Sequence, residues 1–106
     1  MGKIKIPFVF FKDETEAKIS DNELYVNGAE SAIVTIEGEG EVEIQGLADL
    51  NSTEWHSLAL IDKSDFAVYS SLDKSGIFSC SIDGYWKIRA EIKSVSGNLS
   101  VYANIL

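Results

Sequence analysis

The sequence is poor in the residues from which redox, metal and acid–base sites are built. Among its 106 residues there are one cysteine, Cys80, and one histidine, His56. A single cysteine excludes an intramolecular disulfide and a site with several cysteine ligands. Catalysis by histidine needs an orienting carboxylate and a nucleophile, but Ser57, which follows His56, points to the opposite face of a strand. We therefore predict a non-enzymatic protein with no metal and no cofactor.

Long hydrophobic runs and basic residues are also scarce. No apolar run approaches the ~20 residues of a membrane-spanning helix, so a membrane is not an expected partner. Ten acidic residues but no lysine or arginine lie between Lys18 and Lys63, and the net charge is -8. Such a surface repels phosphate backbones, so nucleic acid is not an expected partner either. The start, "MGKIKIPFVFF", has too short an apolar stretch and no small-residue cleavage site, so secretion through a signal peptide is not expected.

The sequence does contain repeated alternation of apolar and polar residues, which is typical of half-buried strands. The alternating runs are short and are separated by turn residues, and sustained helical periodicity is absent. Parallel sheets need long crossover connections, so the strands are expected to be antiparallel. We predict an all-β fold, namely a jelly-roll-like antiparallel β-sandwich with about eight strands. Residues 1–106 are expected to form a single domain.

Two glycine-containing segments are interpreted as hairpin turns, at 38–40 and at 96–98. The four carboxylates of "EGEGEVE" at the first turn are interpreted as a solvated tip in preference to a calcium site, because nothing fixes the remaining ligands. In the strand before the second turn, the charged side chains are predicted to face water. Arg89 lies in this outward row beside Glu91, where we expect a cross-strand ion pair.

The N-terminal segment is the most unusual part of the chain. Residues 1–11 are interpreted as an edge strand or a docking arm, since Pro7 cannot donate a ladder hydrogen bond. The run "IPFVFF" carries apolar groups on both faces, which a half-buried edge strand does not need. Either the segment is buried on both sides, or one face docks on a partner. The candidate docking residues are Ile6, Phe8, Val9, Phe10 and Phe11.

The aromatic residues give an alternative function. Exposed rings stack on sugars in carbohydrate-binding modules, and Trp55 is one candidate for this role. Trp86 is in phase with Ile88 and is therefore expected in the core. Tyr85 and Tyr102 fall on the opposite phase and are the candidate exposed contact residues. A carbohydrate-binding or adhesion module is thus the alternative to a structural role.

The C-terminal run "SGIFSCSIDGYWKIRAEIKSVSGNLSVYANIL" resembles small β-sandwich proteins of tailed bacteriophages and prophages. In that family a Gly-aromatic pair and a second glycine precede an aliphatic-Arg-aliphatic strand, a Ser/Thr-Gly turn and a valine-rich last strand. The resemblance covers residues 32–106 and is of moderate specificity, because glycine turns and alternation recur in unrelated sandwiches. The matching positions are Gly76, Phe78, Gly84, Ile88, Arg89, Ala90, Ile92, Ser96, Gly97, Leu99 and Val101.

The resemblance implies a non-enzymatic virion component, such as a capsid decoration or head-fibre protein, or an accessory protein of the neck or tail. The expected partners are other virion proteins, that is, capsid or tail subunits. Proteins of this kind commonly work as homo-oligomers, in which symmetric copies strengthen a weak contact through avidity. The expected location is the virion, after assembly in the cytoplasm of a bacterial host.

Overall fold

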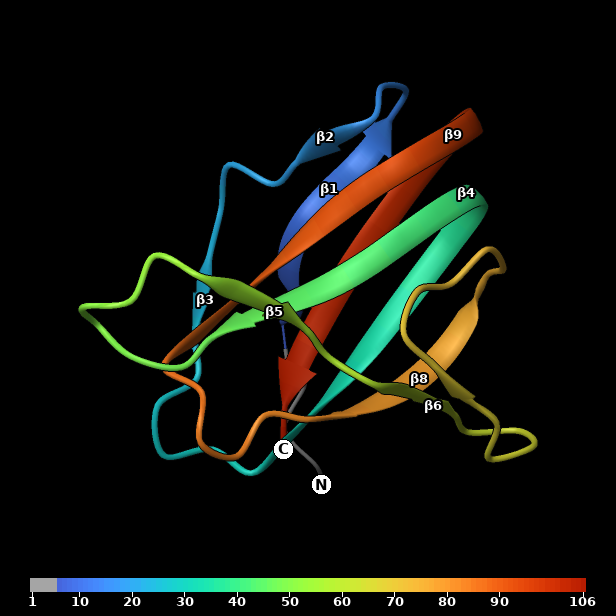
Figure 1. Cartoon of the computed structure of the whole chain (residues 1–106). Helices are drawn as coiled ribbons and strands as arrows, with labels where there is room; N and C mark the ends of the chain where they lie inside the picture. Colours follow the sequence, from blue (N-terminus) through green and yellow to red (C-terminus); the bar gives the residue numbers. More distant parts are fainter. Residues whose placement is uncertain (1–5) are drawn as a thin grey trace.

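The structure is a computed structural model that describes residues 6–106 (Figure 1). Its nine strands pair only antiparallel within one sheet, so the predicted all-β antiparallel fold is confirmed. None of the described residues forms a helix long and apolar enough to cross a membrane. The strands are β1 (Phe8–Glu14), β2 (Lys18–Ile19), β3 (Leu24–Tyr25), β4 (Ser31–Leu47), β5 (Trp55–Ser57), β6 (Leu60–Asp62), β7 (Val68–Tyr69), β8 (Gly76–Ser81) and β9 (Lys87–Ile105).

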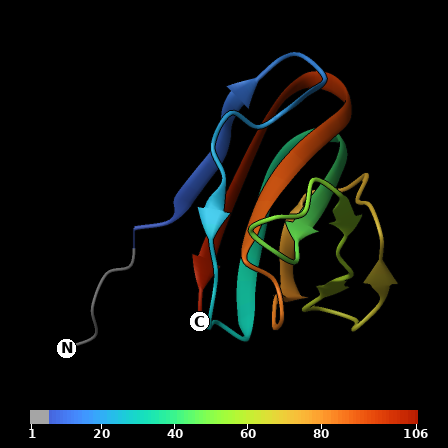
Figure 2. The ribbon, with the colours of Figure 1, turned by 60° about the vertical axis from the view of Figure 1, so that its left-hand side comes forward.

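Two long strands organise the molecule. β4 and β9 have 17 and 19 residues and pair with each other along their lengths. Both bend sharply near the middle, so the ribbon that they form folds back on itself (Figures 1 and 2). The first half of β4 and the second half of β9 form one layer with β1, β8, β6 and β7. The other two halves form a second layer, in which β2 and β3 pair with β9 and β5 pairs with β4.

Glycines allow the bend between the layers. Gly38 pairs with Leu99 and Gly40 pairs with Val95, so residues 96–98 bulge out of the ladder. The φ angles of Gly38 and Gly40 are 107° and 155°, which residues with a Cβ rarely adopt. A Cβ on Gly40 would also lie 2.6 Å from Cδ1 of Leu99. The predicted hairpins at 38–40 and 96–98 are therefore wrong, because each half pairs with the other long strand and the chain continues as one bent strand.

The alternation along β4 and β9 fills one core between the layers. On either side of the bend, buried residues of these strands alternate with more exposed ones over residues 31–36, 41–44, 87–92 and 101–104. Burial of each large apolar side chain contributes roughly 1.5–3 kcal/mol, so the shared core fixes the register of both strands. The inward residues with at most 2% exposure include Ala32, Val34, Ile36, Val42, Ile44, Ile88, Ala90, Ile92, Leu99, Val101 and Ala103.

Candidate functional site

The five candidate docking residues do not share one environment. β1 is an edge strand of the first layer, as Pro7 predicts. Phe10 and Phe11 are only 4% and 5% exposed and belong to the core, because a break in the β1–β9 register turns two consecutive side chains inward. These two residues are therefore unavailable to a partner, which corrects the prediction for them. Ile6 and Val9 are exposed and Phe8 is half-buried, so docking through them stays a prediction, and residues 1–5 lie outside the described residues.

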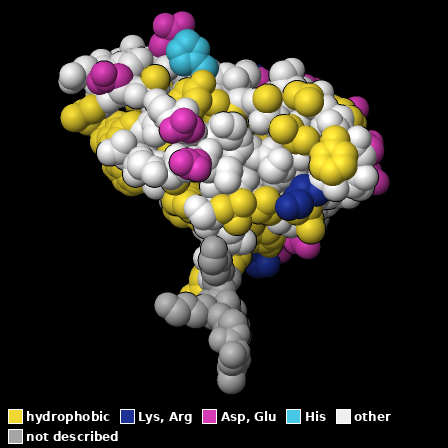
Figure 3. Space-filling view, turned by 90° about the horizontal axis from the view of Figure 1, so that it is seen from below, with side chains coloured by type: hydrophobic (Ala, Val, Ile, Leu, Met, Phe, Trp, Pro, Cys, Tyr) yellow, Lys and Arg dark blue, Asp and Glu magenta, His cyan; other side chains and the backbone are white. Residues whose placement is uncertain are grey.

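An open apolar groove of about 480 Å³ lies beside these residues. Its lining includes Ile6 and Phe8 from the start of the described chain, Leu24 from β3 and Ile105 from the end of β9. Seen from below, hydrophobic side chains reach the surface between scattered charged ones (Figure 3). The groove brings the first and last parts of the described chain to the same end of the molecule.

Tyr85 and Trp86 are both half-buried, so neither has the environment that the alternation predicted. The Tyr85 ring packs on the core, and a Cβ on Gly46 would lie 2.6 Å from it. The Trp86 ring lies instead beside the exposed Tyr25, with the ring centroids 5.4 Å apart and the planes at 72°. β9 begins only at Lys87, so Tyr85 and Trp86 belong to the preceding bend and do not follow the alternation of the strand. Tyr102 lies on the outer side of the first layer but is half-buried, so its role as a contact residue stays a prediction.

The outer side of the first layer carries two neighbouring cross-strand rows without a charged residue. One row runs from β1 to β8 and ends next to Lys63, whose backbone N–H donates to the carbonyl of Ile77, and the other runs from β9 to β7. The alternate residues of the same strands are buried, so these rows face away from the core. We call them the uncharged face, which consists of Val9, Tyr102, Thr35 and Ile77 in the first row and Asn104, Ile33, Ser79, Ile61 and Val68 in the second.

The outer side of the second layer is charged and densely hydrogen-bonded. The side-chain amide of Gln45 donates to Glu43 over 2.7 Å and to Glu91 over 2.8 Å. Lys93 is 3.1 Å from Glu91 and 3.8 Å from Glu43. Burial of the Glu91 carboxyl favours its neutral form, but the hydrogen bonds from Lys93 and Gln45 prevail and lower its pKa. The charges of Glu43, Glu91 and Lys93 thus partly neutralise one another.

Arg89 lies within this network but does not form the predicted ion pair. Its Nε–H donates to Oε1 of Gln45 over 2.7 Å, and Gln45 is its cross-strand neighbour. Its guanidinium carbon lies 4.1 Å from the centre of the Trp55 ring. Among the described residues no carboxylate oxygen lies within 4.0 Å of the guanidinium. The prediction of a cross-strand ion pair for Arg89 is therefore wrong, because its cross-strand neighbour is Gln45 and not a carboxylate.

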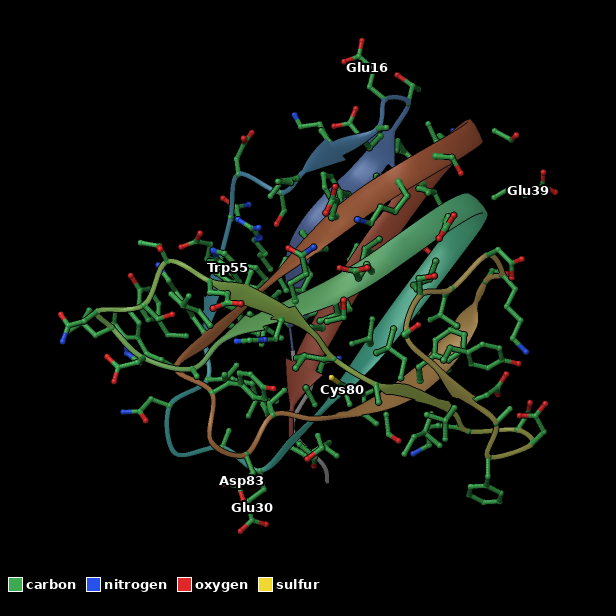
Figure 4. The ribbon with its side chains drawn as sticks, viewed as in Figure 1. Glu16, Glu30, Glu39, Trp55, Cys80 and Asp83 are labelled. Carbon is green, nitrogen blue, oxygen red and sulfur yellow. The ribbon has the colours of Figure 1, made fainter. Side chains whose placement is uncertain are left out.

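Three aromatic rings surround the ammonium group of Lys87 next to Arg89. Its Nζ is 5.1 Å from the centre of the Trp86 ring and 5.8 Å from the centres of the Tyr25 and Trp55 rings. The same Nζ is 2.6 Å from a carboxylate oxygen of Glu23. One cross-strand row contains Tyr25 on β3, Lys87 on β9, Leu47 on β4 and Trp55 on β5. This row positions the rings of Tyr25 and Trp55, and Trp86 directly precedes Lys87 in the chain. Figure 4 shows Trp55 beside β5, at the side where β3 and β5 lie. We call Tyr25, Trp55, Trp86, Lys87 and Arg89 the aromatic–cation cluster.

Comparison with protein families shows to which family the chain belongs. The family model described as XepA matches residues 5–105. The chain belongs to the XepA family. The structure of the SPBc2 prophage-derived protein YomS has 26% sequence identity and a TM-score of 0.82, and the match covers 99% of this chain and 98% of that chain. The structure of the PBSX exported protein XepA has 25% identity and a TM-score of 0.83, and the match covers 97% of this chain but 39% of that chain. No curated protein sequence matches the chain.

The XepA family relationship connects the chain to bacteriophages. Both matched structures are prophage proteins, and one of them is described as exported. The resemblance to small phage β-sandwich proteins is thus supported at the level of phage association. Since the chain spans 39% of the PBSX protein, that relative contains a large additional part beyond the shared domain.

The residues that most often carry catalysis are separated in this member of the XepA family. Cys80 is buried, and desolvation raises the pKa of its thiol to about 12, so the thiol is protonated at neutral pH. His56 is exposed on β5 in the other layer. Within residues 6–106 no group of three His, Cys, Asp or Glu residues is arranged to hold a metal ion. The carboxylate of Glu43, next to the "EGEGE" tip, is instead engaged with Gln45 and Lys93.

Proposed function

We propose that the chain is a non-enzymatic structural protein of a phage virion that attaches to other protein subunits through the uncharged face. The observation that carries the proposal is the contrast between this face and the rest of the molecule. The chain has a net charge of -8 and a quarter of its residues are charged. The two rows of the uncharged face nevertheless run from β1 to β8 and from β9 to β7 without a charged side chain, and Lys63 borders the first row at Ile77.

The exposure of the apolar side chains on this face supports a docking role. Ile77 is 52% exposed and Val68 is 65% exposed, and Val9 is 37% exposed. Exposed apolar side chains gathered on one uncharged sheet face commonly mark contacts between proteins. The prophage origin of both structural relatives supports a virion subunit as the partner.

We further propose that the chain forms a homo-oligomer through this face. Two copies that each carry a charge of -8 repel one another wherever their acidic surfaces meet. The uncharged face lets two copies approach without placing like charges in contact. Several copies in one assembly would then strengthen attachment to the capsid or the tail through avidity.

Charge substitution on the uncharged face tests the attachment. Ile77→Lys places a charge on an exposed side chain near the start of β8, so it should leave the fold intact and reduce the molar mass measured by light scattering to that of a monomer. Thr53→Lys adds the same charge to an exposed loop position outside the face and serves as the matched control. An unchanged molar mass in Ile77→Lys, or an equal loss in Thr53→Lys, would contradict a homo-oligomer formed through this face.

Analysis of phage particles tests the virion role separately. The phage that encodes this chain is induced, purified by density gradient and examined by mass spectrometry. Peptides of the chain should be present in the intact particles at a constant ratio to the capsid protein. Their absence from particles, with the protein found only in the lysate, would contradict a structural role in the virion.

A further inference from the structure

We infer that the aromatic–cation cluster is a binding site for a carbohydrate that carries a carboxylate group. This function goes beyond virion attachment and uses the opposite outer side of the sandwich. The inference starts from Arg89, which is the only arginine of the chain. Acidic residues outnumber basic ones by 17 to 9, yet none of the described carboxylates forms a salt bridge with its guanidinium, although its charge helps to lower the pKa of Glu91.

Arg89 is held in a fixed orientation. Its guanidinium lies over the Trp55 ring, and its Nε–H donates to Gln45. Gln45 cannot rotate freely, because its amide donates to Glu43 and Glu91 at the same time. The side chain of Arg89 is half-buried, and its two terminal amino groups have no acceptor among the described residues. A guanidinium fixed in this way presents two parallel N–H groups that match the oxygens of a carboxylate.

The aromatic rings beside the guanidinium provide the surface for the body of the ligand. Tyr25 is 62% exposed, and Trp55 and Trp86 are half-buried. The charge of Lys87 among the rings is already neutralised by Glu23 at 2.6 Å. Aromatic surface with a few fixed polar groups is the usual composition of small-ligand sites, and the C–H faces of sugar rings pack well on it.

The charges of the molecule favour a sugar with isolated carboxylates over a nucleic acid. A phosphate backbone carries a charge on every nucleotide and would be repelled by a chain of net charge -8. A glycan with one carboxylate in every second sugar places its charge on Arg89 and its neutral rings on the aromatic residues. A neutral glycan would leave the terminal amino groups of Arg89 without an anionic partner.

Tryptophan fluorescence provides a direct test, because both tryptophans of the chain belong to the cluster. The full chain is titrated with uronate-containing and sialylated oligosaccharides, including the tetrasaccharide of alternating glucuronate and N-acetylglucosamine. The matched neutral probe is the tetrasaccharide of N-acetylglucosamine alone. We expect a saturable change in emission with the acidic probes and affinity at least about tenfold lower for the neutral one.

Variants then assign the binding to the cluster. Arg89→Gln should remove the preference for acidic probes, Arg89→Lys should restore part of it, and Trp55→Ala should weaken binding of both probe classes. Phe66→Ala removes a 77% exposed ring outside the cluster and should change nothing. Melting curves of all variants confirm that they are folded. The inference is overturned if no acidic glycan binds, if neutral and acidic probes bind equally, or if a glutamate-rich peptide binds as tightly as the acidic glycans.

Discussion

Asp62 is a carboxylate that the fold buries at the end of β6. It is 6% exposed, and its oxygens lie 2.6 Å from Nζ of Lys74 and 2.7 Å from Oγ of Ser64. The backbone N–H of Ser64 donates to the same carboxylate. The hydrogen bond from Lys74, followed by those from Ser64, lowers the pKa of Asp62 from 3.8 to about 2. The same contact with Asp62 raises the pKa of Lys74. Asp62 and Lys74 thus each stabilise the charged form of the other.

The lowered pKa of Asp62 predicts a pH-dependent contribution to stability. Because the folded chain holds the proton less tightly than the unfolded one, the contribution is complete above pH 3.8 and is lost as the pH falls towards 2. Asp62→Asn should therefore lower the free energy of unfolding at neutral pH, and the difference from the parent chain should shrink below pH 4. Urea unfolding at a series of pH values measures this difference.

The control for Asp62→Asn is a carboxylate without such contacts. Glu16 is exposed at the tip after β1 and projects into solvent (Figure 4). Glu16→Gln should leave stability nearly unchanged over the same pH range. A difference between Asp62→Asn and the parent chain that stays constant down to pH 2 would contradict the role of the ionised carboxylate.

The sequence predicted the burial of some side chains correctly and that of others wrongly. The alternation predicted the inward positions Ile88, Ala90 and Ile92 correctly, since these lie well inside a regular strand. It failed at Tyr85 and Trp86, because these residues precede the strand and the backbone there does not have a period of two. No local signal distinguishes the last residue of a bend from the first residue of a strand, and the contact of Tyr85 with Gly46 is long-range.

At the scale of elements, the bend in β4 and β9 is the feature that the sequence left ambiguous. Glycine pairs with intervening polar residues are found both at hairpin turns and at bulges within a continuous strand. The choice depends on which segment supplies the pairing partner, and for 31–38 and 40–47 that partner is β9. The strands themselves were predictable, whereas their pairing required information from distant parts of the chain.

The bend predicts different tolerance of its glycines. Gly40→Ala combines an unfavourable φ with contacts to backbone and to Leu99, so it should reduce the free energy of unfolding by about 2–5 kcal/mol. Gly97 lies in the same bend, in the part of β9 that bulges out, and its φ is 93°. Nothing lies within 4 Å of a Cβ added to it. Gly97→Ala should therefore lose only about 1–2 kcal/mol. Chemical denaturation of both variants measures the difference, and equal losses would contradict a crowded inner side of the bend.

At the scale of the whole molecule, the two layers share their central strands. Each layer contains half of β4 and half of β9, and both halves contribute side chains to one core. Neither layer can separate without breaking the ladder between these two strands. The domain should therefore unfold as one cooperative unit, as small single domains usually do.

Matched substitutions on either side of the bend test this cooperativity. Ile36 belongs to the first layer and Ile44 to the second, and they are 2% and 0% exposed. Ile36→Ala and Ile44→Ala should each lower the stability by about 2–5 kcal/mol. Calorimetry should show a single transition for both variants, with equal calorimetric and van't Hoff enthalpies. Two separate transitions in either variant would show that the layers unfold independently.

The open groove near the chain ends has a consequence for how this domain is built into longer proteins. Ile6 and Ile105 line the same groove, so the polypeptide enters and leaves the sandwich from one pole. A module with neighbouring entry and exit points can be spliced onto another polypeptide with little disturbance to its remaining surface. Additional sequence at either end would project from that pole, whether it is natural, as in the longer PBSX relative, or added as a reporter. It would leave the bend at Gly38 and Gly40 unobstructed.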